Sequence, residues 1–157
     1  MRIQGPRLAL AALALALAGC GGTGGSQTSL DIKQVPLVSG ASVLAQARQC
    51  DQGANAFCAL EAVIVDRRYH SSGALVASEH RQLRKLGWSS MAGDDGDEQA
   101  AESPGHKLRL TYATAANDLI GIDEKWIKRP GSIGLALSRT MFNRTAAMSV
   151  MLEVGPT

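Results

Sequence analysis

Several stretches of the chain have the hydrophobic pattern of β-strands. Residues 107–115 and 148–154 alternate between apolar and polar side chains, as strands with one buried face do. The run at 57–66 contains consecutive β-branched side chains, which is typical of an interior strand. Residues 88–92 are predicted to form a short strand. Residues 42–50 are predicted to form one arm of a hairpin, although their Ala and Gln content also favours a helix.

Two helices are predicted between the strands. The first begins at Ser71–Ser72, where the Ser72 hydroxyl is a candidate N-cap. Gly87 and Trp88 fit a left-handed C-terminal cap that is closed by an apolar contact. The second helix follows Pro130–Ser132 and keeps the spacing of one apolar face. The apolar stripe of the first helix is Leu75, Val76, Leu83 and Leu86, and that of the second is Ile133, Ala136, Leu137, Thr140 and Met141.

The order of these elements indicates an α+β fold. From residue 57 onward they run strand, helix, strand, strand, helix, strand, which is the order of a split β-α-β, or ferredoxin-like, domain. We therefore expect a small, mainly antiparallel sheet with both helices on one face. Residues 42–50 add an N-terminal hairpin strand to this expected sheet. Such a fold supports many activities, so it does not by itself indicate a function.

The first nineteen residues have the layout of a secretory signal peptide. Arg2 and Arg7 precede an unbroken apolar run from Leu8 to Ala18, and this succession of charged and apolar segments is typical of an export signal. The run is shorter than the about 20 apolar residues that a helix needs to span a bilayer. We therefore expect residues 1–19 to be removed after export.

The end of this segment, Leu17-Ala18-Gly19-Cys20, resembles the lipobox of bacterial lipoproteins. The resemblance implies a diacylglycerol thioether on Cys20, with an amide-linked acyl chain in many bacteria, and two or three acyl chains anchor a protein firmly. Gly21 rather than aspartate follows the cysteine, which implies the outer membrane where the cell has one. In a cell with a single membrane, the implied location is its outer face. The alternative is an ordinary signal peptide with an incidental cysteine.

The mature chain is expected to be one domain on a tether. Residues 20–37 are rich in Gly, Ser and Thr and are expected to form a flexible, lipid-anchored tether, whereas residues 38–157 form a single globular domain. Loss of Arg2 and Arg7 with the signal peptide leaves 14 of the 16 basic residues against 14 acidic residues. The mature chain is therefore formally neutral. This balance argues against nucleic acid as a partner, because a phosphate backbone requires a basic surface.

Cys50 and Cys58 are the two cysteines that remain for the folded domain. They lie eight positions apart, and the turn-forming residues 51–55 between them let the sulfurs meet across a tight loop. In an oxidising compartment we expect a structural disulfide. A redox or metal-binding pair is the alternative, but the spacing is not Cys-x-x-Cys and no histidine lies nearby in the sequence.

The sequence contains no evident catalytic or cofactor motif, and we expect no cofactor. The nearest approach to a metal site is an acidic cluster in the predicted loop 93–105, where Asp94, Asp95, Asp97 and Glu98 offer oxygen ligands suited to Ca²⁺. Counted from Asp95, the fifth and sixth positions are Gln99 and Ala100. An EF-hand loop has an oxygen ligand and a glycine at these two positions, so the register does not match. A solvated loop is the simpler interpretation.

Two functions remain open. The first is a non-catalytic envelope module that binds another envelope protein or a cell-wall polymer and contacts the membrane through the lipid on Cys20. The alternative is a lipid-anchored enzyme, or a small-ligand or Ca²⁺ binder, whose site is dispersed over residues such as His106, Asp118 and Asp123. His80 is expected to be a solvated side chain rather than a base. The first interpretation is favoured because no nucleophile and base stand in a recognisable pattern.

Overall fold

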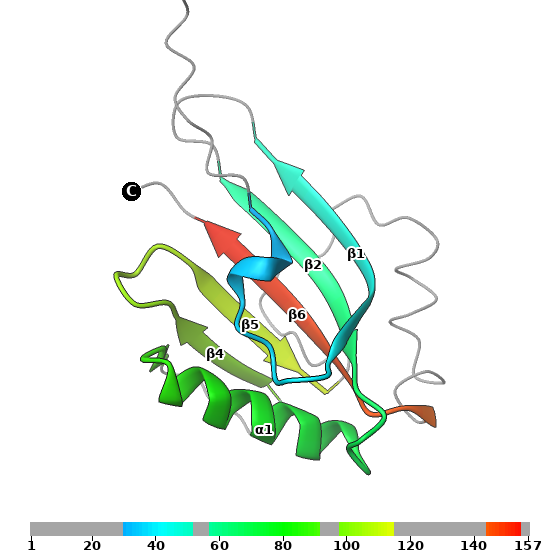
Figure 1. Cartoon of the computed structure of the whole chain (residues 1–157). Helices are drawn as coiled ribbons and strands as arrows, with labels where there is room; N and C mark the ends of the chain where they lie inside the picture. Colours follow the sequence, from blue (N-terminus) through cyan, green and yellow to red (C-terminus); the bar gives the residue numbers. More distant parts are fainter. Residues whose placement is uncertain (1–29, 52–56, 92–97, 115–143, 155–157) are drawn as a thin grey trace, which may run out of the picture.

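The computed structural model describes residues 30–51, 57–91, 98–114 and 144–154. These residues form one six-stranded antiparallel sheet in the order β1-β2-β6-β5-β4-β3, with an α-helix against it (Figure 1). The elements are the 3-10 helix η1 (Ile32–Gln34), β1 (Ser42–Cys50), β2 (Cys58–Val65), α1 (Ser72–Lys85), β3 (Ser89–Ser90), β4 (Glu98–Glu102), β5 (Arg109–Ala113) and β6 (Ala147–Val154).

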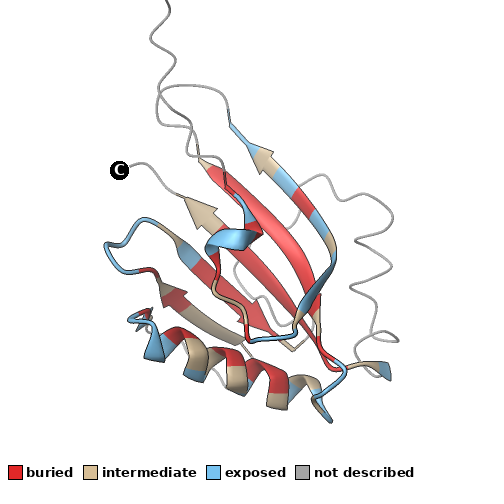
Figure 2. Cartoon of the chain, in the orientation of Figure 1, coloured by how far each residue is buried: buried red, intermediate tan, exposed pale blue. Residues whose placement is uncertain are grey.

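Strands β2 and β6 form the centre of the sheet. They pair along their whole length, from Cys58 opposite Val154 to Val65 opposite Ala147. Nearly all of their side chains are buried on both faces of the sheet (Figure 2). This burial explains the continuous apolar run of β2, because a strand that has no solvent-facing side needs no polar alternation.

Helix α1 packs on one face of the sheet through its apolar stripe. Leu75, Val76 and Leu83 are buried and share the main core with the inward-facing side chains of β2, β5 and β6. Leu86, which the pattern places in the same stripe, is 48% exposed because the helix ends at Lys85. The apolar face of the helix is therefore one turn shorter than predicted.

The N-terminus of α1 begins one residue earlier than the predicted cap. Ser71 is the N-cap, and its hydroxyl accepts a hydrogen bond from the backbone N–H of Ala74 at 3.2 Å. The hydroxyl of Ser72 instead accepts a hydrogen bond from the backbone N–H of Ala147 at 3.1 Å. The two adjacent serines therefore have different roles, since one caps the helix and the other connects it to β6.

The C-terminus of α1 has the predicted left-handed cap. Gly87 has a φ of 83°, which a glycine adopts at little cost. The backbone N–H of Trp88 donates to the carbonyl of Leu83 at 3.0 Å, and the N–H of Gly87 donates to the carbonyl of Arg84 at 3.1 Å. These two bonds define a Schellman motif. Trp88 and Leu83 are both buried in the main core, as an apolar closure of the cap requires.

The folded domain begins earlier than the sequence pattern predicts. Leu30, Ile32 and Val35 lie in the main core, although the prediction assigns residues 30–37 to the flexible tether. A capping box also stabilises η1 in this segment. The boundary at residue 38 is therefore wrong, because a few apolar side chains within a polar stretch are enough to hold it against the sheet.

Strand β4 lies inside the predicted acidic loop. It pairs with β5 from Glu98 opposite Ala113 to Glu102 opposite Arg109, and Ala101 is buried in the core. The loop prediction is therefore wrong for this part of residues 93–105. The strand is polar by composition, and its formation depends on pairing with β5 rather than on its own hydrophobicity.

The α+β class and the antiparallel sheet are confirmed, and so is the hairpin strand at 42–50, which is β1. The ferredoxin-like order is not confirmed. Strand β6 lies between β2 and β5, whereas a ferredoxin-like sheet has its last strand at an edge. The second predicted helix, over residues 132–141, lies outside the described residues. A pair of helices on one face therefore stays a prediction.

Candidate binding site

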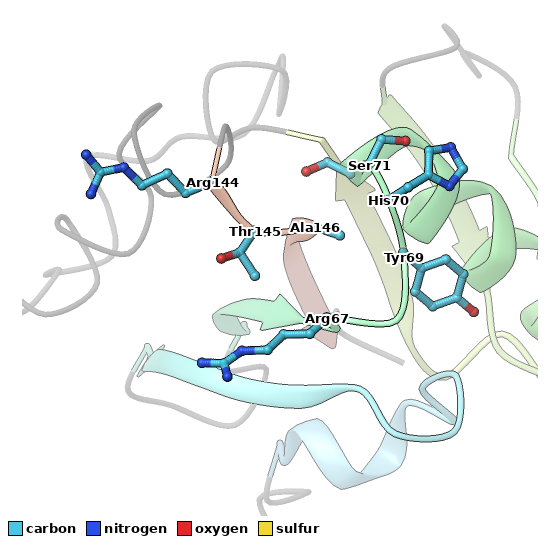
Figure 3. Close-up of a pocket in the computed structure, with 8 residues that line it drawn as sticks. Arg67, Tyr69, His70, Ser71, Arg144, Thr145 and Ala146 are labelled. Atoms are coloured by element: carbon cyan, nitrogen blue, oxygen red, sulfur yellow. The ribbon is translucent and has the colours of Figure 1, made fainter.

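A cleft opens at the end of the sheet where β2 leads into α1. It has a volume of about 570 Å³ and lies between the β2–α1 loop and the residues that lead into β6 (Figure 3). The described residues that line it are Arg67, Tyr69, His70, Ser71, Ser72, Arg144, Thr145 and Ala146.

Hydrogen bonds join the two walls of this cleft. The backbone N–H of Asp66 donates to the carbonyl of Ala146 at 3.0 Å. Close by, the hydroxyl of Ser72 accepts a hydrogen bond from the backbone N–H of Ala147, the first residue of β6. The backbone at Arg67 and at Thr145 is positioned by these bonds, because each of the two residues is adjacent to a bonded one. The cleft is therefore built on the sheet and not on a free loop.

Asp66 and Arg68 form an ion pair in the β2–α1 loop. The side chain of Asp66 is buried, and its Oδ2 lies 2.5 Å from Nη2 of Arg68. Its Oδ1 also accepts the backbone N–H of Arg68 at 2.9 Å. The pKa of Asp66 lies below its usual value, mainly because the guanidinium of Arg68 donates a hydrogen bond to the carboxylate. Burial of Asp66 has the opposite, smaller effect. The pair fixes the loop and neutralises the charge of Arg68.

Arg67 and Arg144 supply the positive charge of the cleft. Both side chains are exposed, and neither takes part in an ion pair within the described parts of the chain. Figure 3 shows the two arginines extending in the same direction, with Thr145 between them, whereas Tyr69 and His70 lie on the other side. None of the described lining residues is acidic. The described lining residues therefore give the cleft a positive local potential.

Glu79 is a second unusual group, and it lies in the core. This residue of α1 is fully buried, and its Oε2 accepts the backbone N–H of Val38 at 2.9 Å. Within the described structure its Oε1 has no hydrogen-bond partner. Burial raises the pKa of Glu79 to about 7, and the bond from Val38 opposes part of that rise. The carboxyl group contacts the N-terminal segment and does not line the cleft.

Two histidines have side-chain partners. Nδ1 of His80 lies 2.9 Å from the hydroxyl of Tyr112, which is a buried residue of β5. The expectation that His80 is simply solvated is therefore wrong. Nδ1 of His106 lies 2.5 Å from a carboxylate oxygen of Glu102 in the turn between β4 and β5. The His80 contact joins α1 to β5, the His106 contact lies within the β4–β5 turn, and neither histidine lines the cleft.

The predicted disulfide is present. Cys50 and Cys58 are bonded and face each other as the last pair in the register of β1 and β2. Cys58 is buried and belongs to the main core. The bond therefore closes the hairpin, as expected of a structural disulfide, and the alternative of a redox or metal-binding pair is not needed.

The remaining predicted site residues are mostly not described. Glu98 lies in β4 and therefore does not belong to a loop. In the described ranges, no group of three or more His, Cys, Asp or Glu side chains is placed to hold a metal ion. The acidic Ca²⁺ site and the dispersed site stay predictions. The residues outside the described ranges are Cys20, Asp94, Asp95, Asp97, Asp118 and Asp123.

The sequence did not predict the arginine pair of the cleft or the buried carboxyl group of Glu79. Arg67 and Arg144 lie far apart in the chain, and no local pattern connects them. Glu79 had a detectable signal, because Leu75, Glu79 and Leu83 are spaced by four residues and so share one stripe of the helix. A carboxylate at the centre of an apolar stripe is a candidate for burial.

Comparison of the chain with protein-family models, with curated proteins and with solved structures found no match. Among the helices of the described residues, none combines the length and the apolar character needed to cross a membrane. The interpretation of the cleft therefore depends on its own residues and their chemistry.

Proposed function

We propose that the chain is a lipid-anchored, extracytoplasmic binding module that presents its basic cleft to an anionic partner in the cell envelope. The resemblance of Leu17–Cys20 to a lipobox supports the anchor. The positive lining of the cleft supports an anionic partner. An envelope protein or a cell-wall polymer with anionic groups fits this description, whereas nucleic acid requires a broader basic surface than a neutral chain offers.

The observation that carries this proposal is the distance between the start of the domain and the cleft. Nη1 of Arg48 donates to the carbonyl of Leu30 at 3.1 Å, and Arg48 pairs with Leu60. The residues that line the cleft begin beyond Val65, at the other end of β2, whose course Figure 1 shows. At about 3.3 Å per residue, the strand from Leu60 to Val65 places the β2 partner of Arg48 roughly 17 Å from the start of the cleft. An anchor attached through Leu30 therefore leaves the cleft accessible to a partner.

The side chains of the cleft favour binding over catalysis. A hydroxyl nucleophile needs a base within hydrogen-bond reach, and that base is normally oriented by a third group. The hydroxyl of Ser71 is occupied as the cap of α1, and that of Ser72 accepts the N–H of Ala147. Within the described structure, no side-chain partner orients His70. Among the described lining residues, neither serine hydroxyl is paired with a base, so the arrangement suits the binding of an anion.

Intact mass spectrometry of the membrane fraction tests the anchor. Cells express the wild type, Cys20→Ala, and Ser26→Ala as a control that leaves the lipobox unchanged. We expect wild type and Ser26→Ala to begin at Cys20 and to carry acyl groups. Cys20→Ala is expected to lack acyl groups and to leave the membrane fraction. A wild-type protein that is secreted without lipid would contradict the proposed anchor.

A further inference from the structure

We propose that the cleft binds a phosphate group, held between Arg67 and Arg144 with the hydroxyl of Thr145 as a further donor. This inference rests on the proposed function and deepens it, because it names the chemical class of the ligand. All three side chains belong to described residues and line the same cleft.

The two arginines are available to an external anion. Arg68, which is adjacent to Arg67, is already paired with the buried carboxylate of Asp66. Arg67 and Arg144 have no comparable contact in the described parts of the chain. Because both are also exposed, they can turn toward a ligand without breaking an existing ion pair. The cost of binding is then mainly the ordering of two side chains.

The donors of the cleft fit a tetrahedral oxyanion better than a carboxylate. Each guanidinium can donate two parallel hydrogen bonds to the oxygens of one anion. A carboxylate has two oxygens that lie in one plane, and one arginine in this geometry bonds to both of them. A phosphate group has four oxygens arranged tetrahedrally: at least three are non-bridging in inorganic phosphate or a monoester, and a diester has two non-bridging oxygens and two weaker ester oxygens. A phosphate group can therefore bond to Arg67, to Arg144 and to the hydroxyl of Thr145, which lies between them (Figure 3).

The start of α1 adds to the positive potential of the cleft. Ser71 lines the cleft and is the N-cap of this 14-residue helix, and a helix N-terminus is equivalent to about half a positive charge. The first turn contains no acidic residue. No carboxylate of this first turn therefore competes with an incoming anion, and the helix supplements the two arginines.

A phosphate group can reach the cleft from two sources. One is a phosphodiester, as in a lipid headgroup or a wall polymer, and the other is free inorganic phosphate. Both present non-bridging oxygens to the arginines. They differ in charge at neutral pH, since a diester carries one negative charge and inorganic phosphate between one and two. Two probes can therefore distinguish the sources at the same site.

Isothermal titration calorimetry of the mature protein in neutral detergent at low ionic strength tests this inference. The probes are inorganic phosphate and glycerophosphoglycerol, a diester without acyl chains, and acetate serves as the carboxylate control. The test variants are Arg67→Ala and Arg144→Ala. Arg81→Ala is the matched control, because Arg81 is an exposed arginine of α1 outside the cleft. Thermal unfolding followed by circular dichroism checks that each variant is folded.

We expect saturable binding of a phosphate probe, weaker binding of acetate, and about a tenfold loss of affinity in each cleft variant but not in Arg81→Ala. Binding of inorganic phosphate alone supports a free-phosphate site, and binding of the diester supports a headgroup or polymer. Absence of saturable binding, equal binding of acetate, or an equal loss in Arg81→Ala overturns the inference. Phosphate binding by a protein that proves unlipidated contradicts only the anchor, whereas a lipidated protein without phosphate binding contradicts only this inference.

Discussion

The carboxyl group of Glu79 on α1 accepts a hydrogen bond from the backbone N–H of Val38, and this bond fastens the N-terminal segment to the helix within the core. The N–O distance is 2.9 Å, and the two residues are 41 positions apart. Both are buried. In the described structure the second carboxyl oxygen of Glu79 has no partner, so the ionised form is held in the core at a cost.

The burial of Glu79 makes the stability of the domain depend on pH. The pKa of Glu79 in the folded protein, about 7, lies above its ordinary value of 4.5, so the folded state binds the proton more tightly than the unfolded state. The resulting stabilisation is fully present below pH 4.5 and is lost as the pH rises through 7. The difference between the two pKa values corresponds to roughly 3 kcal/mol at most.

Glu79→Gln is expected to raise the free energy of unfolding at pH 8 by about 1–3 kcal/mol relative to wild type. The amide retains an acceptor for the N–H of Val38 and cannot ionise, so the two proteins should have similar stability near pH 4.5. Urea unfolding followed by circular dichroism at both pH values measures this. Asp51→Asn, which changes an exposed carboxylate, is the control. A Glu79→Gln variant with the same pH dependence as wild type would refute the assignment.

The disulfide is expected to contribute about 2.5 kcal/mol to the free energy of unfolding, because it closes a loop of about nine residues in the unfolded chain. The variant that carries both Cys50→Ala and Cys58→Ala should lose this amount. Guanidinium unfolding with and without reductant measures it, and the double variant is the control that should not respond to reductant. A wild-type midpoint that stays constant after reduction, with reduction verified by mass, would show that the bond adds no stability.

Two glycine substitutions are expected to have opposite effects. At Gly87 an added Cβ lies 3.6 Å from Cγ of Pro104 and fits, but the φ of 83° is unfavourable for any other residue. Gly87→Ala should therefore lower the free energy of unfolding by about 1–2 kcal/mol.

At Gly73, in the first turn of α1, an added Cβ meets no atom within 4 Å. Gly73→Ala should raise stability by about 0.5–1 kcal/mol. Thermal unfolding measures the stability of both variants. A loss of stability in Gly73→Ala as well as in Gly87→Ala would contradict this explanation by backbone conformation.

The sequence predicts those elements whose determinants are local. Strand β2 follows from its β-branched run, and the C-terminal cap of α1 follows from Gly87 and Trp88. The disulfide follows from the spacing of Cys50 and Cys58 and from the turn-forming residues between them. In each case the residues that determine the feature lie within about ten positions of one another, so a single stretch of sequence contains the signal.

Features that depend on tertiary contacts are not visible in the sequence. Strand β4 is polar and forms because β5 offers it a pairing edge. The cleft joins Arg67 and Arg144 only because β6 returns beside β2 in the sheet. The N-cap provides an intermediate case, since Ser71 and Ser72 are both suited to the role and only the contact with Ala147 distinguishes them.

The burial of Leu30 has a consequence for how far the domain can move from its membrane under the proposed anchorage. A tether that ends at residue 37 contains 17 residues beyond Cys20 and spans at most roughly 60 Å, at about 3.5 Å per residue. Because Leu30 is packed in the core, only residues 21–29 remain, and they span at most roughly 30 Å. The domain is then confined to a thin layer next to the bilayer, so any partner of the cleft has to come within that layer.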